Sequence, residues 1–482
     1  MSANFLHGVE TIELNIGTRP IRGVKTAVIG LVGTAPIYDV DTGERIPHIQ
    51  KLTLNDLNAR RYFGADRNGY TIPAALKAGF DQGDGPIYIV INVLDPEVHS
   101  SNVTDEAHTF TVTNRITLAH SQVANVIVKN TAGSTTYVAG TDYLVNQGDG
   151  TISRLDSGSI AANSGVKVTY VHLDVSKVTS ADIIGEVDAA GNRTGMQAFL
   201  ESYQKWGFYP KTLIVPGYSS QVEITSAMTA LASRIRAIAI VDAPAGTTPL
   251  QAITGRGPDG TINFNTSSER TVLCYPHLKR YNTATNEEEI VPYSSYYAAV
   301  LARSDIENGY WWSPSNQEIR NITGVERNIT AMINDPTSEA NALNEAGITT
   351  VFNSFGSGFR IWGNRSAAWP DGTQPRYFVN IRRVADVIHE SIEYSSIQFI
   401  DQPITNAWID SVTESVNGFF RTLIARGALI DGNCWYDPLL NDASELALGH
   451  VVFSYTFMPP PPAERITFES FIDINLLKTL GT

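Results

Sequence analysis

The chain has 482 residues, of which 43% are hydrophobic and 17% charged, and 35 Lys and Arg against 49 Asp and Glu give a net charge of −14. This composition is typical of folded domains, and the length predicts about three of them. An acidic chain is poorly suited to non-specific DNA binding, and two cysteines exclude a disulfide framework. No apolar run is long enough for a membrane span and no signal peptide is visible, so we expect no membrane insertion.

The first segment has the pattern of a strand. Apolar residues alternate with polar ones over residues 9–16, and Gly17–Pro20 then forms a turn. No hairpin partner is nearby, so its partner strand must lie elsewhere. We predict a linking arm over residues 1–22, with the apolar strand positions Val9, Ile12, Leu14 and Ile16.

An α/β pattern follows the arm. A buried strand at 26–32, helices at 55–62 and 72–80, and a strand at 87–91 indicate a βαβ unit. The pattern resumes later with further strands and a helix, at 212–215, 237–241, 270–275 and 222–234. We therefore predict a middle domain formed by residues 23–98 and 177–354.

Between these two parts the chain is rich in Thr, Val, Asn, Ser and Gly. Short strands recur there between turns such as Gly148-Asp149-Gly150. This spacing is typical of a small sandwich or barrel. We predict an inserted all-β domain over 99–176, which faces outward, within a mixed, multi-domain α/β core.

Two helices, at 381–393 and 405–426, define a C-terminal α/β domain over 355–458. Four prolines at 459–462 end it, and we predict a second linking arm over 459–482. Its strand-like apolar positions are Ile466, Phe468, Phe471, Ile472, Ile474 and Leu476.

The motifs of common catalytic and cofactor sites are incomplete. Gly217-Tyr218-Ser219-Ser220-Gln221 lacks the second glycine of a hydrolase nucleophile turn, and His389-Glu390 is not followed by the second histidine of a zinc-protease helix. No phosphate-binding loop is present. We predict no enzyme activity, cofactor or metal, and favour a structural role.

Several segments together resemble the sheath proteins of contractile phage tails and related contractile injection machines. They are His7–Glu10, Arg19–Ile21, Thr26–Pro36, Arg236–Pro244, Ser313–Ser315, Leu343–Ile348 and Gly358–Arg365. Within the last and most specific of these lie Arg360, Trp362, Gly363, Asn364 and Arg365. We expect Trp362 to be a buried core anchor, and Arg360 and Arg365 to hold carboxylates or carbonyls.

The resemblance implies a helical homopolymer around an inner tail tube protein, with baseplate and tail terminator proteins as further partners and no direct contact with nucleic acid. It implies assembly in the host cytoplasm, a place in the virion tail, and contraction from a metastable extended state that drives the tube through the host envelope. Terminal strands that add to neighbouring sheets suit such a lattice. The resemblance also makes the C-terminal domain tube-proximal, and its candidate tube-facing charges are Arg382, Arg383, Asp386, Asp410, Glu414, Arg421 and Arg426.

Two alternatives remain open at this point. An α/β hydrolase with a carbohydrate-binding β domain would use Ser219 or Ser220 as its nucleophile. A receptor-binding virion protein would use residues 99–176 as the adhesin. A sheath protein forms polymers and turns over no substrate, and this combination distinguishes it from both alternatives.

Overall fold

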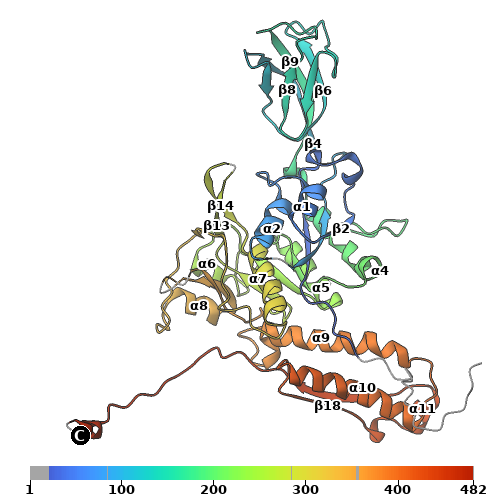
Figure 1. Ribbon diagram of the computed structural model, residues 1–482, viewed down its shortest axis with the longest axis vertical. Helices are drawn as coiled ribbons and strands as arrows, with labels where there is room; N and C mark the ends of the chain where they lie inside the picture. Colours follow the sequence, from blue (N-terminus) through green and yellow to red (C-terminus); the bar gives the residue numbers. More distant parts are fainter. Residues whose placement is uncertain (1–20, 84, 284, 354–355, 357, 481–482) are drawn as a thin grey trace, which may run out of the picture.

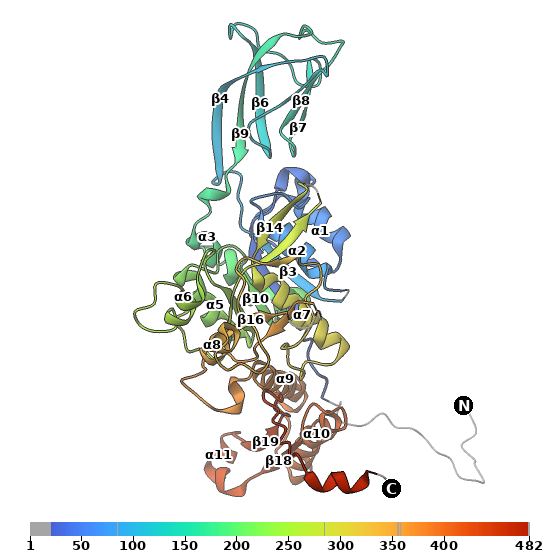
Figure 2. The same cartoon turned by 90° about the vertical axis from the view of Figure 1, so that its left-hand side faces the viewer.

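A computed structural model describes residues 21–480, except 84, 284, 354–355 and 357. The molecule is elongated, with a β domain at one end, an α/β middle domain, and a helical C-terminal domain at the other end (Figures 1 and 2). Residues 1–20 of the arm predicted over 1–22, and with them its strand positions, lie outside the described residues. No helix within the described residues has the length and apolarity of a membrane span.

The middle domain is built on one eight-stranded sheet. Its six inner strands run parallel, and the strands at its two ends are antiparallel to their neighbours. In spatial order the strands are β17 (Arg360–Trp362), β16 (Ile348–Phe352), β12 (Thr271–Cys274), β11 (Ile238–Asp242), β10 (Thr212–Ile214), β1 (Val28–Gly33), β3 (Ile87–Asn92) and β2 (Gln50–Thr53).

Helices cover both faces of this sheet, which explains why its inner strands are apolar on both sides. The first face carries α3 (Ser180–Ile184), α4 (Ser202–Trp206), α5 (Val222–Ile235), α6 (Pro249–Thr254) and α8 (Glu339–Glu345). The second carries α1 (Asp56–Phe63), α2 (Thr71–Phe80) and α7 (Tyr293–Glu307). A small sheet lies beside the second face, made of β13 (Leu278–Asn282), β14 (Glu287–Val291) and β15 (Gly324–Val325).

Residues 100–173 form two three-stranded antiparallel sheets around a separate hydrophobic core. One sheet has the order β4 (Ser100–Thr109), β9 (Gly165–Leu173), β6 (Val123–Asn130). The other has the order β5 (Arg115–Thr117), β8 (Thr151–Arg154), β7 (Tyr143–Asn146). The β domain is joined to the middle domain by two chain connections, one into β4 and one out of β9. They lie side by side because β4 and β9 pair with each other.

The C-terminal domain contains α9 (Val379–Ser396), α10 (Asn406–Ala425), the short α11 (Ala443–Ala447) and a hairpin of β18 (Asp431–Tyr436) and β19 (Phe453–Met458). Thr405 caps α10 by accepting a hydrogen bond from the Trp408 N–H at 3.1 Å. A stripe of apolar residues on α10 is buried against α9 and the hairpin: Val412, Val416, Phe419, Phe420 and Leu423.

The structure corrects one boundary drawn from the sequence. Residues 360–362 were assigned to the C-terminal domain, but β17 pairs with β16 and completes the sheet of the middle domain. The C-terminal arm is extended without pairing over 466–473 and continues as a 3-10 helix at Ile474–Thr479. A strand needs a partner for its backbone groups, and the described residues of a single chain offer this arm none, so the predicted pairing of 466–476 with a neighbouring copy stays a prediction.

Candidate functional site

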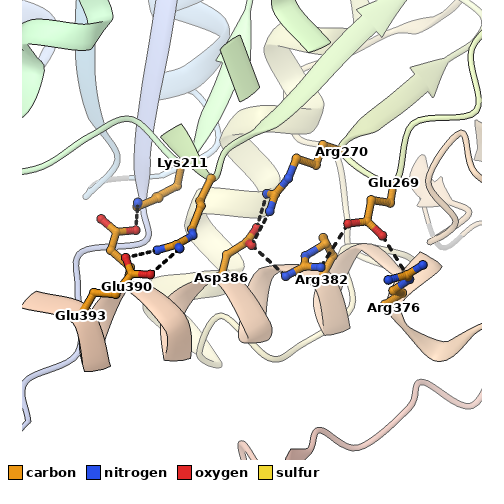
Figure 3. Close-up of polar contacts among 9 residues, drawn as sticks. Lys211, Glu269, Arg270, Arg376, Arg382, Asp386, Glu390 and Glu393 are labelled. Atoms are coloured by element: carbon orange, nitrogen blue, oxygen red, sulfur yellow. Dashed lines mark hydrogen bonds and ion pairs between the residues drawn. The ribbon is translucent and has the colours of Figure 1, made fainter. Parts of the chain in front are cut away.

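Helix α9 joins the C-terminal domain to the middle domain through charged side chains that are buried. Asp386 lies at the centre, where it accepts hydrogen bonds from Arg270 at 2.5 and 2.7 Å and from Arg382 at 2.9 Å (Figure 3). Arg382 also forms an ion pair with Glu269 at 3.1 Å, and Glu269 forms a second ion pair with Arg376 at 3.3 Å. These contacts link one helix to the loop that leads into β12.

Two further pairs extend the contact along α9. Lys211 pairs with Glu390 (Figure 3). Arg383 donates to Asp305 of α7 at 2.7 Å. All four side chains are at most 6% exposed. We call the buried charges of α9 and their middle-domain partners the α9 seam: Arg382, Arg383, Asp386 and Glu390, with Lys211, Glu269, Arg270 and Asp305.

Burial sets the electrostatics of this seam. It lowers the pKa of the Lys211 amine, although Glu390 opposes that shift. At the exposed end of α9, Arg236 holds the pKa of Glu393 below its ordinary value through hydrogen bonds at 2.5 Å. The seam is therefore a set of matched charges rather than a catalytic cluster.

This placement corrects part of the sequence prediction for tube contact. Arg382, Arg383 and Asp386 were expected on an exposed helix face, but they are buried in the seam. Their pattern on α9 alone could not reveal partners that come from distant segments. The other four expected charges remain exposed on α10 or just after it: Asp410, Glu414, Arg421 and Arg426.

The residues of the Gly358–Arg365 motif are also placed. Ile361 is the fully buried residue of β17, whereas Trp362 points to the other face, is half-buried, and stacks on Phe352 with ring centroids 4.4 Å apart. The core residue of β17 is thus Ile361 and not the expected Trp362, because alternation along a strand puts neighbours on opposite faces. Arg360 donates to the Asn316 carbonyl at 2.8 Å.

The next three residues of this motif fix the backbone conformation and the side-chain contacts of the segment that follows β17. Gly363 has φ +127°, and a Cβ there would lie 2.6 Å from Asn344 Oδ1, so a side chain is excluded. Asn364 donates to the Asn380 side chain at 2.9 Å. Arg365 stacks over Phe378 and pairs with Glu464 at 2.5 Å, which fixes the root of the C-terminal arm to the middle domain.

Beyond Glu464 the arm exposes a run of large apolar side chains. Its members include Ile466, Phe468, Phe471, Ile472, Ile474 and Leu476, each at least 66% exposed. The arm extends away from the rest of the molecule (Figure 1). Such an apolar run in water indicates a partner surface that the isolated chain does not provide.

The C-terminal hairpin has one edge open. The Cys434 N–H and carbonyl both bond to the Asn417 side chain of α10, at 2.7 and 2.9 Å, so they point away from β19. Its partner Tyr455 must then also direct its backbone groups away from β18. In the described part of the chain no strand lies beside that outer edge of β19.

Of the two nucleophile candidates of the hydrolase alternative, Ser219 is fully buried and Ser220 is partly buried. The Ser219 hydroxyl accepts the Asp242 N–H at 3.2 Å, and Asp242 in turn accepts from the Ser294 N–H at the start of α7. Ser219 and Asp242 thus stabilise a helix start. Across the described residues, no group of three or more His, Cys, Asp or Glu is arranged to hold a metal ion.

Together, the fold and the unpartnered arm define a structural protein that assembles with other chains. The family model for the central domain of phage tail sheath proteins matches residues 177–367, and the model for the sheath C-terminal domain matches 373–473. A family described only as a protein of unknown function matches residues 95–182.

Full-length relatives agree with these matches. The chain is 52% identical to the tail sheath protein of Burkholderia phage BcepMu, over all of this chain and 99% of the relative, and 25% identical to that of Escherichia phage P2, over all of this chain and 98% of the relative. The chain therefore belongs to the phage tail sheath protein family, whose members are structural proteins of contractile tails and not enzymes. It also shares its fold with the contracted helical sheath of the anti-feeding prophage, at a TM-score of 0.60 and 14% identity over 98% of this chain and all of the other.

Proposed function

We propose that this chain is the subunit of a contractile tail sheath that polymerises helically around an inner tube. The observation that carries the proposal is the exposed apolar C-terminal arm in a molecule that also has an open strand edge on β19. An exposed apolar run and an open strand edge both favour association, and each can supply the partner of the other when copies meet. Two different surfaces that meet between copies build an open helical polymer rather than a closed ring.

The arms act as flexible links in this proposal. Residues 466–476 become a strand when they pair with the β19 edge of a neighbouring copy, which supplies the missing backbone partners. The N-terminal arm, with Val9, Ile12, Leu14 and Ile16, pairs with a neighbour in the same way. Near the end of this arm, Ile21 packs on the core shared by α9, α10 and the hairpin. Each backbone hydrogen bond stabilises the contact by about 1 kcal/mol. A single contact between two copies is therefore weak, whereas many such contacts together hold the polymer firmly.

Contraction uses free energy stored in assembly. The extended sheath is metastable, and a baseplate signal releases it to a shorter, wider state that drives the tube through the host envelope. The subunit itself catalyses nothing. Baseplate and tail terminator proteins are the further partners, assembly takes place in the bacterial cytoplasm, and the product is part of the virion tail.

The tube contact falls to the exposed charges of α10, since those of α9 are buried. Asp410 and Glu414 lie one turn apart on α10, and Glu414 pairs with Arg421. Charge contacts between solvated surfaces are screened and reversible, which suits a sheath that must release its tube. The β domain lies at the opposite end of the molecule and therefore faces outward (Figure 2).

Truncation tests the arms. Chains that begin at Arg19 or end at Pro462 are expected to fold, with an unchanged thermal transition, and to form no tubes in negative-stain micrographs, whereas the full chain forms them. Normal tubes from both truncations would contradict the proposal. Deletion of residues 99–176 should leave tube formation intact. If the chain were instead a receptor-binding protein, neither the full chain nor the deletion variant would form tubes.

Charge reversal tests the tube contact. Asp410→Lys with Glu414→Lys should weaken co-assembly with tube protein, most strongly at low salt, while the sheath still polymerises by itself. Asp156→Lys on the β domain is the matched control, because its side chain is also exposed but lies at the far end. Co-assembly at full strength after reversal would remove α10 from the contact.

A further inference from the structure

The first described residues lie against the C-terminal domain, although the strand that follows them belongs to the middle domain. Shortly before β1, the Lys25 amine lies 4.3 Å from the ring centroid of Phe208. One residue earlier, the Val24 N–H donates to the Ser391 hydroxyl of α9 at 3.3 Å. Ile21 packs on the core shared by α9, α10 and the hairpin. From β1 outward, the chain therefore crosses α9 and reaches α10.

An open groove of about 560 Å³ lies on α10, and Ile21 forms part of its wall. Short side chains line most of its length, at a spacing that places them on one face of the helix: Ser411, Ser415, Gly418 and Thr422. Over these positions α10 rises by about 16 Å, and the four residues that precede Ile21 span about 13 Å when extended. The groove therefore has the length for this segment, and its short side chains leave room for a second backbone.

The groove also carries a carboxylate without an ion-pair partner. Asp410 and Glu414 line it one helical turn apart. Glu414 pairs with Arg421, whereas Asp410 is exposed and forms no ion pair within the described residues. The segment 17–20 has the sequence Gly-Thr-Arg-Pro, so its one charged side chain is the cation of Arg19. The charges of groove and segment are therefore opposite in sign.

We infer that residues 17–20 lie in the α10 groove of their own chain, with Arg19 beside Asp410. The described chain leads into this groove, the lengths match, and the unpaired charge of the groove attracts that of the segment. The arm then leaves its own subunit across α10 before residues 9–16 reach a neighbour.

The contact within one chain does not depend on the proposed sheath function, but its consequence rests on that function. Asp410 is also one of the charges proposed to face the tube. Arm and tube therefore bind the same carboxylate, and the arm covers part of the tube-facing surface until the tube displaces Arg19.

Engineered disulfides in the full chain test the position of the segment. Thr18→Cys is combined with Ser411→Cys in one variant and with Ser415→Cys in another, because a disulfide needs Cα atoms within about 7 Å. The two native cysteines are buried, which shields them from a mild oxidant. At least one engineered pair should close within single chains, at a rate independent of protein concentration, as measured by peptide mass spectrometry.

The matched control is Thr18→Cys with Ala425→Cys. Ala425 is exposed on the same face of α10 but lies beyond the other end of the groove, so this pair should stay open under the same conditions. Closure of the control as fast as the groove pairs would mean that the segment has no fixed position, and would overturn the inference.

Charge exchange tests the pairing of Arg19 with Asp410. In the variant whose disulfide closes, Arg19→Glu and Asp410→Arg should each slow closure by about two- to fivefold, and both together should restore it. Circular dichroism verifies that each variant is folded. Closure of neither groove pair, links only between different chains, or an unchanged rate in both charge variants would overturn the inference. If the groove pair closed but the full chain formed no polymers, the sheath function would fail and this contact would stand.

Discussion

The middle domain holds its two neighbours by different means. At the α9 seam, charges that are almost fully buried pair across the boundary, and Asp386 alone serves both Arg270 and Arg382. At the β domain, Arg67 bridges Asp39 at 2.6 Å and Asp149 at 2.7 Å, but the Asp149 side chain is 44% exposed. Most charges at the first boundary are therefore more deeply buried than Asp149 at the second.

We call the second set of contacts the neck clamp; besides Arg67, Asp39 and Asp149 it contains Gln122. Gln122 is fully buried, donates to Asp39 at 2.9 Å, and accepts from the Tyr38 N–H at 2.9 Å. Buried charges are costly unless every partner is present, whereas partly exposed pairs are screened by water. The seam therefore holds the C-terminal domain in one orientation, and the clamp holds the β domain with a smaller free energy.

The largest effect is expected at the centre of the seam. Asp386→Ala leaves the buried guanidinium groups of Arg270 and Arg382 without their shared carboxylate, and should lower the free energy of unfolding by about 3–5 kcal/mol. Urea denaturation of the full chain measures this. Glu414→Ala, which removes an exposed ion pair on α10, should change stability by less than about 1 kcal/mol. Equal effects of the two variants would show that the seam is as solvated as the surface.

A smaller effect is expected at the clamp. Arg67→Ala should cost about 1–2 kcal/mol, because Asp39 keeps its hydrogen bond from Gln122 and Asp149 is partly hydrated. It should mainly loosen the β domain, seen as faster proteolysis at the chain crossings near residues 95–100 and 174–180. Arg60→Ala, on the exposed face of α1, is the control. Unchanged proteolysis after Arg67→Ala would mean that the paired strands β4 and β9 fix the domain unaided.

The smallest effect concerns pH at the exposed end of the seam. Arg236 lowers the folded-state pKa of Glu393 below 4.5, so this pair adds stability above pH 4.5 that is lost as pH falls through the lower folded-state value. The melting temperature should therefore fall less between pH 6 and pH 3 in Arg236→Ala than in the unchanged chain. Parallel curves would show that the pair does not contribute to folding.

Local patterns in the sequence carried much of the fold. The apolar runs at 26–32, 87–91 and 237–241 correspond to β1, β3 and β11, and the helical pattern over 405–426 corresponds to α10. A strand buried on both faces, or a helix with one apolar stripe, is defined by its own residues, so spacing is sufficient. The motif at Gly358–Arg365, together with the six other segments and their order in the chain, likewise indicated the sheath family.

The tertiary structure decided which charges are buried and which edges are open. Arg382, Arg383 and Asp386 on α9 and Asp410 and Glu414 on α10 look alike in sequence, because both groups are charged positions on amphipathic helices. Only the folded chain brings Arg270 and Asp305 onto α9 and leaves Asp410 and Glu414 of α10 exposed. Whether a charge is buried depends on partners that lie far away in the sequence, as Arg270 does from Asp386 and Asp305 does from Arg383. Whether the outer edge of β19 is open depends on the order of strands in the sheet. Local spacing along the chain encodes neither.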